Sequence, residues 1–108
     1  MDKKIQKIIN DFSEETKQLL KDNLIAEYLF GSASREEYSE LSDIDILIIV
    51  KRFDYKLRAA LSELASDYSL NYDTYISPIL KDEKLWEKNK KYNTLFYQEV
   101  QQDGIRLC

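Results

Sequence analysis

The spacing of hydrophobic and polar positions changes several times along the chain, and each change marks the end of one predicted element. Residues 2–21 place apolar side chains at helical spacing among Lys, Asp and Glu, which predicts an amphipathic helix. Residues 24–30 (LIAEYLF) are a short apolar run that ends at Gly31, as is typical of a buried strand. Residues 43–50 (DIDILIIV) are continuous and β-branched, which predicts a central strand.

The second half of the chain repeats this alternation. Residues 54–68 return to helical spacing, and residues 71–80 (NYDTYISPIL) indicate a third strand, which we expect Pro78 to end. Residues 81–104 predict one or two helices that close at Gly104. The last four residues form either a short strand or a loose tail.

Strands that alternate with helices predict an α/β (α+β) fold, in which a small mixed sheet of three to four strands is flanked by helices. A chain of 108 residues is long enough for one domain, which we expect to span 1–108. Between the first two strands, residues 32–38 predict a helical turn, because Ser34 and Glu37 have the spacing of a capping box.

Composition and charge exclude several classes of function. The chain has no histidine and a single cysteine, Cys108, so neither an intramolecular disulfide nor a Cys/His metal site can form. The net charge of −4 argues against a dedicated nucleic-acid-binding module, and we expect no direct nucleic-acid partner. We find no signal-peptide core and no apolar run near the ~20 residues of a membrane helix. These features predict a cytoplasmic protein without a membrane partner.

Two aspartates bracket Ile44 at the start of the predicted central strand. Side chains two positions apart on a strand face the same side, so Asp43 and Asp45 bring two carboxylates together. Such a pair repels itself at neutral pH unless a cation lies between the two groups. Oxygen ligands select a hard cation such as Mg²⁺ or Mn²⁺. Taken alone, the pair is equally explained as two solvated carboxylates.

A candidate phosphate-binding segment precedes the pair. Gly31 allows the backbone to approach a ligand closely, and the turn after it exposes N–H groups that suit phosphate. Ser32 adds a hydroxyl donor, and Arg35 adds a guanidinium. The simpler alternative is a helix cap and a surface arginine. A phosphate cradle ten residues from a carboxylate pair predicts a nucleotide and metal site.

This combination of glycine-serine, ten residues and Asp-x-Asp resembles the signature of the polymerase-β-like nucleotidyltransferase superfamily. The stretch from Gly31 to Ile48 is similar to the minimal nucleotidyltransferases, which are often paired with HEPN-domain proteins in toxin–antitoxin modules. Ser42, directly before the aspartate pair, also fits the motif. One position departs from it, because Glu36 replaces the glycine that commonly follows the arginine.

The resemblance implies a nucleotidyltransferase that moves AMP from ATP to a hydroxyl acceptor. It implies up to two Mg²⁺ ions, for which Mn²⁺ can substitute, held by Asp43, Asp45 and a third carboxylate from a later strand. Asp73 is the candidate for that third carboxylate, which would also activate the attacking hydroxyl; an ordinary surface aspartate is the alternative. The nucleotide-binding residues that the resemblance implies are Gly31, Ser32, Arg35 and Ser42.

The resemblance also implies a protein partner. The acceptor would be a tyrosine of a HEPN-domain toxin, so the chain would be an antitoxin that acts by AMPylation within a hetero-oligomer. The alternative is a catalytically weak or inactive antitoxin that neutralises a HEPN ribonuclease by stoichiometric binding.

Overall fold

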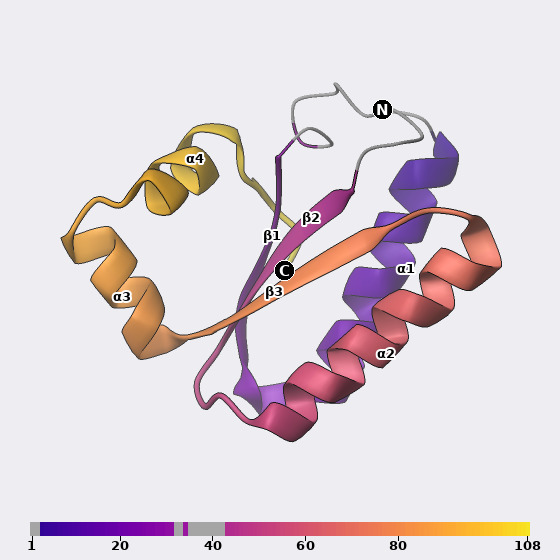
Figure 1. Cartoon of the computed structure of the whole chain (residues 1–108), viewed down its shortest axis with the longest axis horizontal. Helices are drawn as coiled ribbons and strands as arrows, with labels where there is room; N and C mark the ends of the chain where they lie inside the picture. The colour runs from indigo at the N-terminus through magenta and orange to yellow at the C-terminus, as the bar shows by residue number, and fades with distance from the viewer. Residues whose placement is uncertain (1–2, 32–33, 35–42) are drawn as a thin grey trace.

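A mixed sheet runs through the middle of the molecule, with helices on both of its faces (Figure 1). The computed structural model describes residues 3–31, 34 and 43–108. The elements in chain order are α1 (Lys3–Leu20), the 3₁₀ turn η1 (Lys21–Asn23), β1 (Leu24–Phe30), β2 (Ile44–Val50), α2 (Tyr55–Tyr72), β3 (Ile76–Asp82), α3 (Glu83–Lys91), α4 (Leu95–Asp103) and β4 (Ile105–Arg106).

The four described strands lie in the order β3-β2-β1-β4. β1 is antiparallel to β2 and to β4, whereas β2 and β3 are parallel. This order leaves β2 between two strands at its aspartate-bearing end. Asp45 is the register partner of Phe30 on β1 and of Ser77 on β3.

The alternation of side chains along β2 divides the core into two clusters. Ile44, Ile46 and Ile48 are buried in a cluster with residues of α1 and α2. Leu47 and Ile49 are buried in a second cluster, which includes Val100 of α4. β2 is therefore covered on both faces, which explains its continuous apolar sequence. Figure 1 shows α1 and α2 on one side of the sheet and α3 and α4 on the other.

The predicted sheet flanked by helices is confirmed, but the third strand was predicted too early. α2 continues to Tyr72, and β3 begins only at Ile76. The helix extends because Tyr68 still faces the core, where its ring packs edge-to-face on Phe12 at a centroid distance of 5.5 Å. Asp73 then ends the helix in the left-handed conformation, with φ of 52°.

Pro78 lies inside β3 and does not end the strand, contrary to the prediction. The backbone N–H of Ile44 donates to the carbonyl of Tyr75 at 2.7 Å, so Tyr75 and Ser77 direct their backbone groups toward β2. Pro78 alternates with them and faces the free edge of the sheet. A missing N–H there removes no hydrogen bond of the ladder, which is why an edge strand tolerates proline.

The C-terminal region contains two helices, followed by the short strand β4. The helices separate at Thr94, whose side-chain oxygen accepts a hydrogen bond from the Tyr97 N–H at 3.2 Å and caps α4. Gly104 follows α4 as predicted, but its backbone is extended, with φ of −66°. None of the helices in the described ranges is long and apolar enough to cross a membrane.

Candidate functional site

The two aspartates lie where β2 begins, next to the end of β1. Asp43 is exposed and directly precedes the strand, and Asp45 is its half-buried second residue. Ile44, between them, is fully buried against the α1 and α2 side of the sheet. Because side chains alternate along a strand, Asp45 faces the opposite side, and Asp43 lies close enough to act on its charge. The core packing of Ile44 thus fixes the direction of Asp45.

The electrostatics of this pair favour a cation. Burial raises the pKa of the Asp45 carboxyl, and the nearby carboxylates of Asp43 and Glu99 raise it further. These three groups come from two distant parts of the chain, since Glu99 lies on α4. Negative charge is therefore concentrated at the start of β2, where a positive ion would relieve the repulsion.

The backbone of Gly31 lies very close to the side chain of Asp45. Its φ is +75°, which L side chains rarely adopt, and a Cβ at this position would overlap the Oδ2 atom of Asp45. Glycine is therefore the residue that fits here, where the backbone passes the Asp45 carboxylate at the end of β1. The Ser34 hydroxyl donates to the Gly31 carbonyl at 2.7 Å. The glycine of the sequence motif and its second aspartate, Asp45, are thus adjacent in space.

Several predicted site residues lie outside the part of the chain that the structure describes. These are Ser32, Arg35 and Ser42, together with Glu36 and the Glu37 of the expected capping box. Their roles, and the helical turn expected over residues 32–38, stay predictions.

Asp73 does not occupy the strand position that was predicted for it. It is exposed at the end of α2, and β3 begins three residues later. Within residues 3–31, 34 and 43–108, no three His, Cys, Asp or Glu side chains are grouped so that they could hold a metal ion. The role of Asp73 as a third carboxylate stays a prediction. The strand position on which that prediction was based is wrong, because Asp73 precedes β3.

The sequence interpretation missed two residues beside Asp45. Ser77 is its register partner on β3, and Glu99 is the α4 carboxylate that acts on its pKa. The parallel pairing of β2 with β3 brings Ser77 there, and the packing of Phe96 on Phe30, with ring centroids 5.4 Å apart, brings α4 to the end of β1. No local pattern around Ser77 or Glu99 indicates this proximity.

A groove of about 650 Å³ opens beside Asp43, between α2 and the edge strand β3. Its volume falls within the roughly 300–1,000 Å³ of typical ligand pockets. The described residues that line it supply mainly hydroxyl groups and apolar surface, including Asp43, Ser66, Ser69, Leu70, Tyr75 and Ser77.

The residues present fit a hard divalent cation. Two carboxylates lie close together, and one of them, Asp45, lies against Gly31 and near further negative charge. Mg²⁺ usually takes one or two protein carboxylates and completes its shell with water and substrate phosphate. Asp43 and Asp45 would be those two ligands.

Comparisons with known proteins agree with this geometry. A family model described as nucleotidyltransferase domain matches residues 9–105. Protein MJ0141 of Methanocaldococcus jannaschii, provisionally named a protein adenylyltransferase, is 38% identical over 104 residues, which cover 95% of this chain and 98% of that protein.

Two solved structures share the fold. A toxin–antitoxin structure with AMP-PNP has a TM-score of 0.61 at 22% identity, over 92% of this chain and 72% of the other. A complex of the tri-AMPylated HEPN toxin with the MNT antitoxin of Shewanella oneidensis has a TM-score of 0.58 at 23% identity, over 95% and 71% of the two chains. At this identity, the similarity establishes the fold.

Proposed function

This chain belongs to the nucleotidyltransferase domain family, and we propose that it transfers AMP from ATP to a tyrosine hydroxyl of a HEPN-domain toxin. One observation carries the proposal: the glycine of the Gly-Ser motif packs directly against Asp45 of the Asp-x-Asp motif. A relative of almost the same length is named for protein adenylyltransferase activity. A structure of the same fold contains an AMPylated HEPN toxin. We place the reaction in the cytoplasm, where ATP is available.

The reaction forms one bond and breaks one. The phenolic oxygen of the acceptor attacks the α-phosphorus, and the bond from that phosphorus to the oxygen bridging the β-phosphate breaks. Pyrophosphate leaves with the electron pair, the phenolic proton passes to water, and the acceptor keeps AMP. The attacking and leaving oxygens lie in line on opposite sides of the phosphorus.

The residues of the chain position this reaction. Asp43 and Asp45 would hold Mg²⁺, which supplies electrostatic stabilisation to the phosphate oxygens when bound. Asp45 is fixed in direction by the buried Ile44 beside it, whereas exposed Asp43 is accessible to a substrate. Gly31 places no side chain against the Asp45 carboxylate. Phosphate can therefore approach the backbone and the carboxylates together.

One observation favours a second candidate function, a stoichiometric antitoxin. Asp73 lies outside β3, and the β3 residue opposite Asp45 is Ser77, which cannot serve as a carboxylate ligand. A site with two carboxylates would catalyse weakly if the third is essential. The chain would then neutralise its partner through binding alone.

A transfer assay distinguishes the two functions. The purified chain, α-labelled ATP and Mg²⁺ are mixed with a HEPN-domain protein encoded in the same genome, in parallel with Asp43→Asn/Asp45→Asn. We expect label on a tyrosine of the HEPN protein with the wild type, and at least a hundredfold less with the variant. A stable complex without label, for wild type and variant alike, would instead establish the stoichiometric binder.

A further inference from the structure

The order of the strands defines two sides from which a substrate can approach Asp45, one along β1 and one along β3. On one side of this residue lies β1, whose end at Gly31 begins the Gly-Ser motif. On the other side lies β3, with Ser77 as the register partner of Asp45. If the triphosphate of ATP binds at the Gly-Ser motif, the pyrophosphate that leaves lies on the β1 side of Asp45. In-line attack then requires the acceptor to approach from the β3 side.

The groove of about 650 Å³ lies on that β3 side. It begins at Asp43 and runs between α2 and the free edge of β3, past Tyr75 and Ser77. Ser66 and Ser69 line its α2 wall, where their small side chains leave the space open. A hydroxyl group placed in the Asp43 end of the groove would be next to the Asp43 carboxylate.

The lining chemistry favours a protein occupant over a nucleic acid. Among the described residues that line the groove, none is Lys or Arg, although phosphate backbones are bound mainly by such side chains. Leu70 and Tyr75 contribute large apolar surface to the groove and are 84% and 61% exposed. Apolar and aromatic side chains that stay exposed in this way are typical of protein interaction surfaces.

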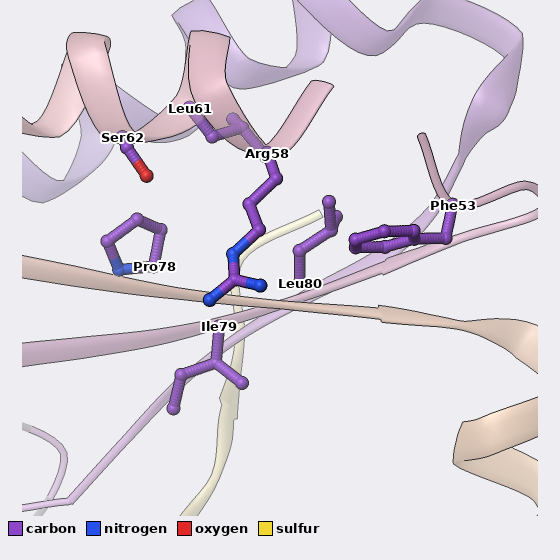
Figure 2. A pocket seen from close by; sticks show the side chains of 7 residues that line it. All are labelled: Phe53, Arg58, Leu61, Ser62, Pro78, Ile79 and Leu80. Atoms are coloured by element: carbon purple, nitrogen blue, oxygen red, sulfur yellow. The ribbon is translucent and has the colours of Figure 1, made fainter. Parts of the chain in front are cut away.

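The same edge continues into a second, smaller pocket of about 300 Å³, which shares Ser62 and Pro78 with the groove. Figure 2 shows the Arg58 guanidinium extending from α2 across β3 and the Phe53 ring beyond it. Arginine and aromatic residues are frequent energetic centres of protein interfaces. Pro78 removes one N–H from this free edge, so side-chain docking is favoured over addition of a strand.

We propose that this groove receives the tyrosine-bearing segment of the partner protein, so that the acceptor hydroxyl enters at Asp43 opposite the leaving pyrophosphate. The proposal rests on the transfer activity proposed above. It assigns acceptor docking to α2 and β3, and nucleotide binding to the end of β1.

The test fills the groove without touching the carboxylates. Ser66→Trp places a large side chain in the groove, and Asp67→Trp, on an exposed neighbour outside the lining, is the matched control. We expect Ser66→Trp to reduce label transfer to the HEPN protein at least tenfold, through a higher KM for that protein. The melting-temperature shift caused by AMP-PNP with Mg²⁺ should stay at the wild-type value, and Asp67→Trp should transfer normally.

A second variant and a cross-linking experiment make every outcome decisive. If Ser66→Trp does not fold, Ser69→Trp replaces it. Normal transfer by the folded tryptophan variant, or label on added RNA in place of protein, overturns the proposal. If the wild type labels no acceptor, the transfer activity itself fails, and cross-linking then decides the docking site.

The cross-linking compares two neighbouring positions on α2. Ser66→Cys and Asp67→Cys, each with Cys108→Ser, carry a benzophenone maleimide, because Cys108 is the single cysteine of the chain. Cross-linking of the HEPN protein from position 66 and at least tenfold less from position 67 supports the groove as the docking site. Equal cross-linking, or none from position 66, overturns it.

Discussion

At the scale of single residues, the site depends on the close approach of Gly31 to Asp45. The positive φ of Gly31 and the position of the Asp45 Oδ2 atom both disfavour a side chain at position 31. An L residue in the left-handed region costs roughly 1–2 kcal/mol before any steric overlap is considered. The steric overlap adds to this cost, because Asp45 cannot easily move away. Its neighbour Ile44 is fully buried and fixes the backbone of this strand.

We therefore expect Gly31→Ala to destabilise the fold by roughly 1–3 kcal/mol and to reduce AMP transfer at least tenfold. A double-mutant cycle with Asp45→Ala, measured by urea unfolding, separates strain from overlap. The effect of Gly31→Ala should shrink when the Asp45 carboxylate is removed. It should persist with Asp45→Asn, which keeps the shape of the side chain. Equal effects in all three backgrounds would contradict the packing argument.

At the scale of elements, a buried carboxyl joins α1 to β1. Glu27 of β1 has no exposed surface, and its Oε2 atom accepts a hydrogen bond from the Ser13 hydroxyl of α1 at 2.8 Å. Its Oε1 atom has no hydrogen-bond partner among the described residues. Burial raises the pKa of Glu27 from 4.5 to about 7, although the Ser13 hydrogen bond opposes the shift. Near neutral pH, this carboxyl is therefore close to half protonated.

The raised pKa gives the stability a defined pH dependence. Between about 4.5 and 7 the folded chain binds more protons at Glu27 than the unfolded chain does. The contribution of this group to stability is thus present below pH 4.5 and is lost as the pH rises through 7. From pH 5 to pH 8, we expect the free energy of unfolding to fall by roughly 2 kcal/mol relative to Glu27→Gln.

Urea unfolding at four pH values from 5 to 8 measures this difference. Glu63→Gln is the matched control, because Glu63 is an exposed carboxyl of α2 that is not among the groups acting on the pKa of Glu27. The control should keep the wild-type slope of stability against pH. A Glu27→Gln variant with that same slope would show that Glu27 is charged in the folded protein at neutral pH.

At the scale of the whole molecule, two helical layers pack on opposite faces of the sheet, and three carboxylates lie near one another at the start of β2. Repulsion among Asp43, Asp45 and Glu99 opposes folding when no cation is bound. We expect Asp43→Asn/Asp45→Asn to melt at a higher temperature than the wild type in metal-free buffer. The substitution should remove activity and yet stabilise the fold.

Cation binding should reverse the order of the two melting temperatures, so that the wild type melts above Asp43→Asn/Asp45→Asn. A ligand that binds only the folded state stabilises it by about 2.7 kcal/mol at a concentration of 100 Kd. Mg²⁺ should therefore raise the melting temperature of the wild type but not that of Asp43→Asn/Asp45→Asn, with NaCl at matched ionic strength as the control. Asp73→Asn belongs in the same series, because loss of the shift would make Asp73 a ligand. An equal Mg²⁺ shift in all variants would contradict a site at the aspartate pair.

The sequence by itself determined the alternation of helices and strands. It also determined that Asp43 and Asp45 lie together, with ten residues between the Gly-Ser segment and this pair. Hydrophobic spacing correctly predicted the strand at 24–30 and the flanking helices, because it reflects which face of each element is buried. The aspartates were placed correctly at the start of β2, since Ile44 must point into the core. Neighbouring residues on one strand or turn obey local geometry, which a sequence contains.

Only the tertiary structure decided which distant residues meet. The end of α2 depends on Tyr68 packing on Phe12, so the start of β3 was predicted five residues early. Ser77 reaches Asp45 through strand pairing, and Glu99 reaches it through helix packing on β1. The groove beside Asp43 exists because α2 lies along the free edge of β3. Such contacts depend on the relative position of whole elements, which no local spacing of residues specifies.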